Sequence, residues 1–544
     1  MRRIFLGNVD KLVCGLVILP FLFSPEVFGA TQSGKTTVVA KWDRFEKAFR
    51  SSVGYSNALQ EATLRVVFTS PRGETNLVYG FWDGGRTWRA RFSPNMLGRW
   101  QFRTTCSDTA NRGLHNQAGE FVCTAATGLT LFNQHGPVRV ARDHRHFEHS
   151  DGTPFFWLAD MVWDGARVAD PADWEFYAST RSSQKFTVAE WSVAPGPDAK
   201  HRTAFSGHDH ITVNPAFFQS LDAKVETLSR AGILNVIAPL HESASPGHTL
   251  AQLPADQAAL LVRYVAARWG ADPVALLLCP DAGHSATTSG DWKKIGRNVF
   301  GEGKQAPVVL YSGHTHRLLD EFRDQNWVDA FGYASFADPT DPADKGIVNS
   351  PFAEEWTKEP IRPLIAFAPP ENGISAQNQK RYSSDDTRHA LYLGLLMSPR
   401  AGISYGGAGV ANWELGDRSE DLPLWHKALF MPEARQIKYL AKLMASPDFW
   451  LLHPEPSFVP AGPTGLRANI AAGGTEAKDF SLIYAPGDRT VELSLTALPA
   501  SATITWLNPR NTESKPAVAV VGEHTCQFPT PEPGDWLLMM KKGK

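Results

Sequence analysis

Residues 215–240 read PAFFQSLDAKVETLSRAGILNVIAPL and contain the clearest evidence for the fold class. Apolar residues recur with helical spacing from Pro215 to Ala231, and an apolar run from Asn235 to Leu240 follows after a short turn. A second unit of the same kind comes next, with a helix predicted over Gln257 to Trp269 and a strand over Val274 to Leu278. Amphipathic helices that alternate with fully apolar strands are typical of parallel βα units.

This alternation extends from about residue 129 to residue 455 and includes eight candidate strands. The predicted strands are Phe155 to Leu158, Phe186 to Ala189, Asn235 to Leu240, Val274 to Leu278, Pro307 to Tyr311, Val328 to Gly332, Pro363 to Phe367 and Gly402 to Tyr405. Another helix is predicted over Asp385 to Met397, after the capping pair Ser383-Ser384. Eight such units over this length predict a (β/α)8 TIM barrel with long loops.

On both sides of this region the pattern changes to short alternating runs separated by turns. Residues 31–128 show strand and turn spacing without helical periodicity, which predicts an antiparallel β-sandwich. Residues 456–544 return to the same pattern and predict a second, smaller β-sandwich. The predicted protein is therefore multidomain, with the barrel of residues 129–455 flanked by an N-terminal and a C-terminal β-sandwich.

The first thirty residues have the order of a secretory signal peptide. Arg2, Arg3 and Lys11 precede an apolar run from Leu12 to Phe23, and the small pair Gly29-Ala30 follows. The run is short for a transmembrane helix, so we expect no stable membrane insertion after cleavage. The sequence therefore predicts export, to the periplasm or to the extracellular space.

Export permits disulfides, and four cysteines follow the predicted cleavage site. Cys106 and Cys123 lie in or just after two neighbouring strand-like runs that a polar, glycine-containing stretch connects. Either a bridge across this hairpin or two free buried thiols agrees with the pattern. There is no C-x-x-C pair, and the histidine spacings match no zinc motif, so neither a metal nor another cofactor is expected.

Composition excludes several classes of protein. The 544 residues include 54 Lys and Arg against 56 Asp and Glu, a near-balance that argues against a nucleic-acid-binding protein. Hydrophobic residues make up 43% and charged residues 20%, which excludes a disordered chain or a multi-span membrane protein.

Catalytic groups in a TIM barrel project from the C-terminal ends of the strands. The residues just beyond the predicted strands are mostly acidic; they are Asp160, Glu190, Glu242, Asp281, His314, Asp338, Glu371, and then Tyr405, Trp413 and Glu414. Asp281 and Glu371 would lie on opposite sides of the mouth. Two facing acids with aromatic residues nearby suit the cleavage of a glycosidic bond, because one acid protonates the leaving oxygen while the other attacks carbon or activates water.

Several motifs resemble one known family. They are Phe68-Thr69-Ser70-Pro71, Gly80-Phe81-Trp82-Asp83-Gly84, Arg91-Phe92-Ser93-Pro94, Gly98-Arg99-Trp100, the run from Asp151 to Asp160, Arg388, the run from Ala401 to Gly406, the run from Val410 to Trp413, and Gly534-Asp535-Trp536-Leu537-Leu538. Together they resemble the bacterial apiosidase-like glycoside hydrolases over nearly the whole mature chain. The resemblance implies a secreted enzyme acting on a complex polysaccharide, with a C-terminal sandwich often labelled collagen-binding.

The resemblance also implies one acid after the fourth strand and another at the end of the seventh. Asp281 matches the first acid, although Cys279-Pro280 stands where the family usually has two glycines. Glu371 is the candidate for the second acid. It could instead match a glutamate that the family carries a few residues further on, which would leave Ala368 in the nucleophile's place. Glu190 or Glu242 would then be the substitute.

Two hypotheses follow from the sequence. The first is a glycoside hydrolase with Asp281 as general acid/base and Glu371 as nucleophile or base. Its substrate would contact the residues Asp160, Trp163, Glu190, Trp191, His314, Tyr405 and Trp413, of which the aromatic ones would stack on sugar rings. The alternative is a glycan- or matrix-binding protein that keeps the barrel but has lost catalysis.

Overall fold

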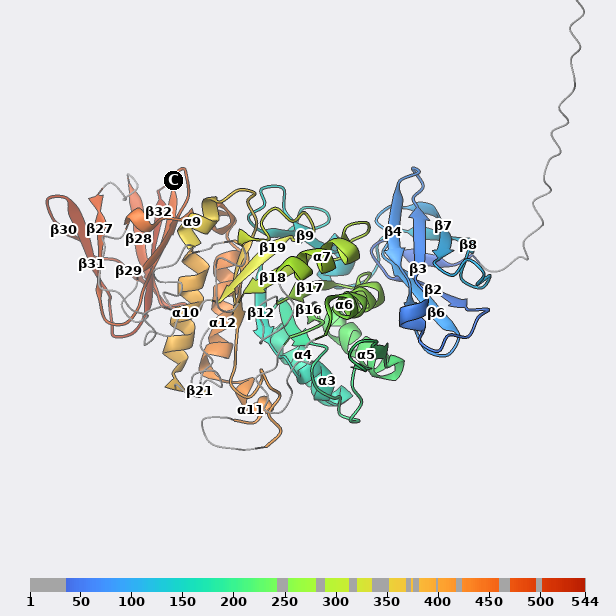
Figure 1. The fold of residues 1–544 in the computed structure, drawn as a ribbon. Helices are drawn as coiled ribbons and strands as arrows, with labels where there is room; N and C mark the ends of the chain where they lie inside the picture. Colours follow the sequence, from blue (N-terminus) through green and yellow to red (C-terminus); the bar gives the residue numbers. More distant parts are fainter. Residues whose placement is uncertain are drawn as a thin grey trace, which may run out of the picture.

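The computed structural model describes residues 36–241, 253–279, 289–312, 320–334, 352–367, 373–374, 381–397, 400–416, 423–458, 470–495 and 501–543. Three bodies lie in a row, with the N-terminal sandwich at one end, the barrel in the middle and the C-terminal sandwich at the other end (Figure 1). Within the described residues, no helix is both long and apolar enough to cross a membrane.

The middle body is a closed barrel of parallel strands. Its strands follow chain order and are β12 (Trp157–Met161), β13 (Val188–Ser192), β16 (Leu234–Ala238), β17 (Val274–Leu278), β18 (Val308–Ser312), β19 (Ala330–Ala334), β20 (Leu364–Phe367) and β23 (Gly402–Tyr405). β23 pairs with both β20 and β12, which closes the barrel. The predicted TIM barrel is confirmed, although β12, β13 and β19 each begin two residues later than the sequence pattern indicated.

Helices surround this barrel. They are α3 (Gly165–Val168), α4 (Pro171–Ser183), α5 (Pro215–Arg230), α6 (Ala255–Trp269), α7 (Ser289–Phe300), α9 (Phe352–Thr357), α10 (Ser384–Met397), α11 (Trp425–Ala428) and α12 (Pro432–Met444). In α5, Pro215 occupies the first turn, where its missing N–H costs no hydrogen bond. Phe217, Leu221, Val225 and Leu228 follow at helical spacing, and all four are buried against the barrel.

A small sheet covers the N-terminal end of the barrel. It consists of β9 (Val138–Val140), β10 (Phe147–His149) and β11 (Pro154–Phe155), with β10 in the centre. Phe147 packs on Trp157 at the start of β12, with 5.3 Å between the ring centroids. This end is therefore filled with apolar side chains, and only the opposite end can form the mouth of a catalytic site.

The N-terminal body is a sandwich of a five-stranded and a three-stranded sheet. The larger sheet has the order β1 (Val38–Ala40), β8 (Ala118–Thr124), β7 (Gly98–Cys106), β3 (Leu64–Thr69) and β4 (Thr75–Tyr79), and the smaller has β2 (Phe45–Arg50), β6 (Thr87–Phe92) and β5 (Phe81–Trp82). A short helix, α1 (Ala58–Glu61), also belongs to this body, and α2 (Leu131–His135) follows it. All strand pairs are antiparallel except β1 with β8, which is parallel.

Buried ion pairs join this sandwich to the barrel. Arg91 of β6 and Arg268 of α6 both contact the carboxylate of Asp222 in α5, at 3.1 Å and 2.6 Å. Arg268 also contacts Asp83, at 3.0 Å. Both arginine side chains are almost fully buried, and the removal of either would take from the Asp222 carboxylate one of its two guanidinium partners.

The C-terminal body is an antiparallel sandwich. Its larger sheet has the order β24 (His453–Pro454), β25 (Ala471–Gly474), β26 (Phe480–Ala485), β32 (Trp536–Lys542), β28 (Ala502–Leu507) and β29 (Ser514–Pro516), and the smaller has β27 (Thr490–Ser494), β31 (Thr525–Pro529) and β30 (Val520–Val521). Arg388 of α10 donates to both carboxyl oxygens of Asp535, each at 2.7 Å, which fixes this sandwich on the barrel.

The structure decides whether Cys106 and Cys123 form a disulfide. Cys106, Cys123, Cys279 and Cys526 are all buried, and none of the four forms a disulfide. Cys123 lies opposite Gly98, at the start of β7, whereas Cys106 lies at the end of the same strand. These ends are about 27 Å apart at ~3.4 Å per residue, and a disulfide needs the two Cα atoms within about 7 Å. Of the two alternatives, the structure has the free thiols.

Candidate active site

The mouth of the barrel lies where the eight strands end, and among the described residues that the sequence predicted, Trp163 lies there. Asp281, Glu371, His314 and Glu242 lie outside the described residues, so their roles stay predictions. The described residues at the mouth include Trp163 after β12, His241 after β16, Tyr311 near the end of β18 and Phe367 at the end of β20. These aromatic and imidazole rings define the part of the site that can be described.

Glu190 lies inside the barrel, in the middle of β13, and is fully buried. Its Oε1 accepts hydrogen bonds from the Trp157 indole at 3.1 Å and from the Ser404 hydroxyl at 2.8 Å. The strand register explains this cluster. β12 lies between β13 and β23, and in it Met161 is opposite Glu190 of β13 and Ala159 is opposite Ser404 of β23. Inward-facing residues of three neighbouring strands therefore meet at one carboxyl group.

Burial raises the pKa of Glu190 to about 8, and the hydrogen bonds from Ser404 and Trp157 only partly oppose this rise. The carboxyl group is therefore protonated at neutral pH. Oε1 already accepts two donors, and Oε2 has no hydrogen-bond partner among the described residues. The proton consequently belongs on Oε2, which makes Glu190 a neutral acid with a hydrogen-bond donor to offer.

Trp163 and His241 pack together above this layer. Ser192 lies two residues beyond Glu190 and donates its backbone N–H to the Trp163 carbonyl at 2.9 Å, which places Trp163 one layer closer to the mouth. The rings of Trp163 and His241 are 4.1 Å apart between centroids. Trp163 keeps 9% of its surface exposed. It is therefore placed to contact a ligand that enters the mouth.

His241 was not among the residues predicted from the sequence. Burial lowers its pKa to about 4, with a smaller opposing effect from Asp164, so the imidazole is neutral at pH 7. Its buried Nδ1 has no hydrogen-bond partner among the described residues. A neutral imidazole with a free ring nitrogen can bind a hydroxyl group without adding charge to the site. The only sequence signal was its position directly after the third strand.

Tyr311 is a second residue that sequence reasoning missed. It is partly buried inside the barrel, and its ring lies 4.9 Å from that of Phe367. Trp163 and Tyr311 keep some surface exposed at the mouth, whereas Phe367 is fully buried behind Tyr311. Such rings can stack on the apolar faces of a sugar.

Asp160, Trp191 and Tyr405 lie on the outer face of the barrel, not at its mouth. Asp160 accepts hydrogen bonds from Arg181, at 2.7 Å, and Tyr177, at 2.8 Å, in α4. Trp191 donates to Asn235 at 3.2 Å, and Tyr405 donates to Glu433 of α12 at 3.0 Å. All three side chains are fully buried between strands and helices, so this placement gives them structural partners and no access to a ligand.

Trp413 lies beyond β23 but is also buried, with 2% of its surface exposed. Its ring is stacked on Trp425 at 4.1 Å between centroids and packs against Trp174 and Tyr177 of α4. In this structure it supports the packing beside the mouth and does not line it.

No metal site was found in the part of the chain that the structure describes. Groups of three or more His, Cys, Asp or Glu side chains that could hold an ion do not occur there. The chemistry available from the described residues is therefore that of a buried neutral acid, a neutral imidazole and aromatic rings.

Comparisons with known proteins agree with this architecture. A family model described as "Apiosidase-like, catalytic domain" matches residues 141–451, which are more than half of the chain. A model of a domain of unknown function, DUF5060, matches residues 38–107 in the N-terminal sandwich. A comparison with curated proteins gave no match.

Solved structures of glycoside hydrolases have the same fold. A glycoside hydrolase of family 5 from Bacteroides vulgatus ATCC 8482 superposes with a TM-score of 0.65 at 16% identity, covering 76% of this chain and 94% of its own. A proposed glycoside hydrolase from the same bacterium gives a TM-score of 0.69 at 17% identity, covering 94% of this chain and 100% of its own. At this identity the likeness concerns the fold alone. The span of the family model goes further, and it shows that the chain belongs to the apiosidase-like family of glycoside hydrolases.

Proposed function

We propose that this protein is an exported glycoside hydrolase that cleaves a glycosidic bond in a complex polysaccharide by acid and base catalysis. The observation that carries the proposal is Glu190, a carboxyl group buried inside the barrel with only neutral hydrogen-bond partners, where burial raises its pKa to about 8. Aromatic rings from Trp163 and Tyr311 lie at the mouth. Protonated acids and stacking surfaces are what glycoside hydrolysis requires, because the leaving oxygen needs a proton as the bond to the sugar carbon breaks.

In this proposal Asp281 is the general acid/base and Glu371 is the nucleophile or base. One carboxylic acid transfers its proton to the glycosidic oxygen, and the other carboxylate either attacks the sugar carbon or takes a proton from the attacking water. Glu190 is the alternative partner of Asp281, supported by its protonated state. Trp163 and Tyr311 would hold the sugar ring against the mouth.

The test is to measure product release from a polysaccharide panel with the variants Asp281→Asn, Glu371→Gln and Glu190→Gln. Each variant keeps the size of the side chain and removes the ability to exchange a proton. Loss of general acid/base catalysis lowers turnover by about 10² to 10⁴-fold. Glu175→Gln is the matched control, since Glu175 is exposed on α4, and we expect full activity from it.

The outcomes separate the possible second carboxylates. Loss of turnover in D281N and E371Q supports the proposed pair, and full activity in either one contradicts it. Loss in E190Q with normal activity in E371Q would make Glu190 the second acid, provided that the variant still folds. If the unmodified protein binds a polysaccharide but releases no product from any substrate, the hydrolase proposal fails and a glycan-binding protein takes its place.

Export is a separate part of the proposal. It is supported by the basic residues and apolar run of the first thirty residues, which lie outside the described part. N-terminal sequencing of the protein recovered from a bacterial periplasm should give a chain that starts close to residue 31. Recovery of the uncleaved chain from the cytoplasm would contradict export without affecting the hydrolase assignment.

A further inference from the structure

A groove lies on the outside of the barrel, where α12 meets the C-terminal sandwich. It has a volume of about 410 Å³, and its lining includes Phe430, Arg435, Gln436, Lys438, Tyr439 and Arg510. Figure 1 shows α12 beside α10, on the side of the barrel that faces this sandwich. We call this surface the α12 groove, and its volume is in the range of sites that bind small molecules or parts of larger ones.

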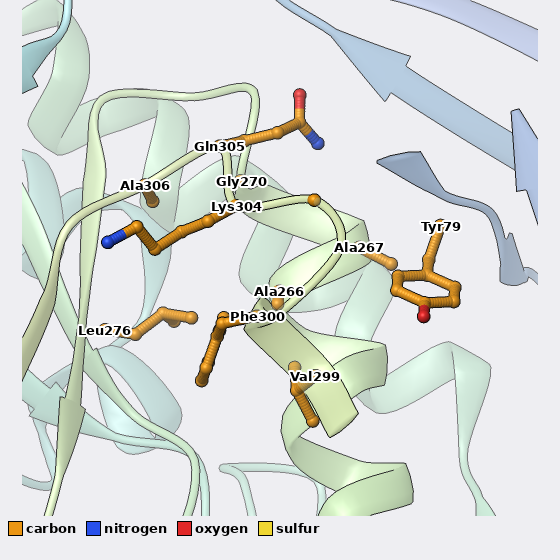
Figure 2. Close-up of a pocket in the computed structure, with 11 residues that line it drawn as sticks. Tyr79, Ala266, Ala267, Gly270, Leu276, Val299, Phe300, Lys304, Gln305 and Ala306 are labelled. Atoms are coloured by element: carbon orange, nitrogen blue, oxygen red, sulfur yellow. The ribbon is translucent and has the colours of Figure 1, made fainter. Parts of the chain in front are cut away.

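The α12 groove is much larger than a cavity between the barrel and the N-terminal sandwich. Figure 2 shows that cavity, which the ends of α6 and α7 form with Tyr79 of the N-terminal sandwich. Its volume of about 20 Å³ is sufficient for about one water molecule, and Leu276 and Phe300 are among the apolar residues that line it. The α12 groove, in contrast, is lined by exposed polar side chains that a ligand can reach from solvent.

Three exposed cations follow one face of α12. Arg435, Lys438 and Lys442 are spaced by three and four residues, so their side chains lie one above another along the helix. From Arg435 to Lys442 this stripe extends about 10 Å, at ~1.5 Å per residue. Within the part of the chain that the structure describes, none of the three forms an ion pair with an acid. A small anion would reach one end of the stripe, whereas a polymer can follow it.

Arg510 presents a further guanidinium from the opposite side of the groove. It lies in the turn between β28 and β29, and its Nε donates to Asn508 at 3.0 Å. Gly534 leaves room for this side chain, since a Cβ atom there would lie 2.0 Å from Nη1 of Arg510. Among the described residues, its two terminal nitrogens have no hydrogen-bond acceptor. The guanidinium is therefore held in place with donors to offer.

The acids at this junction do not neutralise the stripe. Asp385 and Asp535 both pair with Arg388, at 2.6 Å and 2.7 Å, and Asp535 also lies 3.8 Å from Arg510. Two acids thus face two arginines, and the three charges on α12 remain uncompensated. The whole chain has 54 basic and 56 acidic residues, so this is a local excess of positive charge that attracts anions.

Two aromatic rings lie among these cations. Phe430 keeps 41% of its surface exposed, and the Arg435 guanidinium lies 5.6 Å from the centre of its ring. The ammonium groups of Lys438 and Lys442 lie 5.2 Å and 5.5 Å from the centre of the Tyr439 ring. Such rings can stack on the apolar face of a sugar, while a guanidinium matches a carboxylate with two parallel hydrogen bonds. The combination favours sugar units that carry carboxylates.

The groove begins at the end of the barrel that carries the mouth. Tyr405, the last residue of β23, donates to Glu433 in the first turn of α12 at 3.0 Å. At the other end of the helix, the Met444 carbonyl accepts from Trp450, whose ring packs on Phe156 just before β12. The stripe therefore leads from the mouth end of the barrel toward the opposite end, along its outside.

We propose that the α12 groove binds an acidic polysaccharide, a polymer whose sugar units carry carboxylates, as a site separate from the barrel mouth. The charge of the ligand follows from the groove itself. The choice of a polysaccharide among polyanions is supported by the aromatic rings and rests on the proposed function. Such a site holds the protein on a polymer whose other units reach the mouth, which raises the local concentration of substrate.

The test measures the affinity of the full-length protein for polygalacturonate, by its retardation in native gels that contain this polymer. The triple variant Arg435→Gln/Lys438→Gln/Lys442→Gln removes the three uncompensated charges and keeps long polar side chains. Each exposed contact is weak, but the loss of all three should reduce affinity about tenfold or more at low salt. The methyl ester of the same polymer keeps the sugar rings without the charge, so it should retard the protein little.

A second triple variant, Lys47→Gln/Arg50→Gln/Lys185→Gln, is the control with the same change in charge. Its three side chains are exposed, and none of them lines the α12 groove. We expect it to bind polygalacturonate like the unmodified protein. Thermal unfolding of both triple variants shows whether they are folded, which substitutions at exposed positions should allow.

One further variant separates a polysaccharide from other polyanions. Phe430→Ala removes the exposed ring and should weaken binding to polygalacturonate about three- to tenfold. Polyglutamate carries carboxylates without sugar rings, so F430A should bind it as the unmodified protein does. Leu97→Ala is the control, because it removes an exposed apolar side chain from the N-terminal sandwich and should change neither affinity.

Several results would overturn the proposal. These are equal affinity in the two triple variants, or equal retardation by polygalacturonate and its methyl ester. Loss of affinity in the α12 triple variant with unchanged binding in F430A would overturn the choice of a polysaccharide and leave a site for polyanions in general.

The proposed function fails separately. If no substrate is hydrolysed but retardation still depends on the α12 cations and on Phe430, the α12 groove remains a polysaccharide site on a protein without hydrolase activity. If hydrolysis occurs and retardation does not depend on these residues, only the inference about the groove fails.

Discussion

The inner and outer faces of the barrel wall each hold a buried carboxyl group, and only the outer one has a charged partner. On the outer face, Asp160 is paired with the Arg181 guanidinium. On the inner face, Glu190 has only neutral partners, the Trp157 indole and the Ser404 hydroxyl. Burial raises the pKa of both groups, but only Asp160 has a cation that opposes the rise. The comparison indicates that the outer carboxyl serves structure, whereas burial without a cation favours the neutral form of the inner one.

Removing the outer cation should have the largest effect. Arg181→Met would leave Asp160 buried with only the Tyr177 hydroxyl as a hydrogen-bond partner among those described above. Breaking a buried ion pair in this way costs about 3 to 5 kcal/mol. The free energy of unfolding from urea titrations measures the loss. Arg230→Met is the control, because Arg230 is largely exposed and its loss should change stability by less than ~0.5 kcal/mol. Equal losses in the two variants would show that Asp160 does not depend on Arg181.

The next largest effect is the dependence of the protein's stability on pH that Glu190 causes. The pKa of Glu190 rises on folding from its ordinary 4.5 to about 8, so the folded protein binds this proton more tightly than the unfolded chain does. Its stabilising contribution is therefore full below pH 4.5 and is lost as the pH rises toward 8. Between pH 5 and pH 7 the loss should be roughly 2 to 3 kcal/mol.

Glu190→Gln should remove this part of the pH dependence, since glutamine does not titrate. The free energy of unfolding of the variant and of the unmodified protein is measured at pH 5, 7 and 9. The difference between the two proteins at each pH isolates the contribution of Glu190, because the other titrating groups contribute equally to both. Parallel stability profiles for the two proteins would mean that Glu190 is not protonated in the folded state.

A smaller effect follows from one of the neutral partners. Ser404→Ala removes the 2.8 Å hydrogen bond to Oε1 and leaves the bond from Trp157. The hydroxyl lowers the pKa of Glu190, so its loss should raise that pKa further and cost about 1 kcal/mol. The stability profile of S404A should therefore keep falling to higher pH than that of the unmodified protein. A shift of the profile to lower pH would contradict this arrangement.

The smallest expected effect comes from a variant on the outer face of the barrel. It tests whether Tyr405 has a structural role or contacts the substrate. Tyr405→Phe removes the hydrogen bond to Glu433 and should cost about 0.5 to 1.5 kcal/mol in stability. Because Tyr405 points away from the barrel interior, KM and kcat for the best substrate should stay as they are. A raised KM with unchanged stability would instead support the sequence-based expectation that Tyr405 contacts the sugar.

The predicted site shows where local sequence patterns stop being informative. Asp160, Trp191 and Tyr405 each lie within the last two residues of a strand, as expected, whereas Glu190 lies in the middle of β13. The strands of a TIM barrel are buried on both faces, so no polar alternation marks which residues point inward. Only Glu190 among these four faces the interior, and its companions Trp157 and Ser404 come from strands far apart in the sequence.

His241 and Tyr311 were missed for a related reason. Both lie at strand ends, but a lone tyrosine or histidine there does not by itself indicate a site, and nothing local marks a histidine that will be stacked on Trp163. The cysteine pairing depended on the register of β7 and β8, which periodicity does not reveal.

The order of the domains, the eight strands of the barrel and its position between two sandwiches could be derived from the sequence, because hydrophobic periodicity is a local property that each segment carries alone. The direction of each side chain and the raised pKa of Glu190 could not. They arise only when strand register and domain packing bring distant residues together and exclude water from them, and burial of that kind exists only in the assembled molecule.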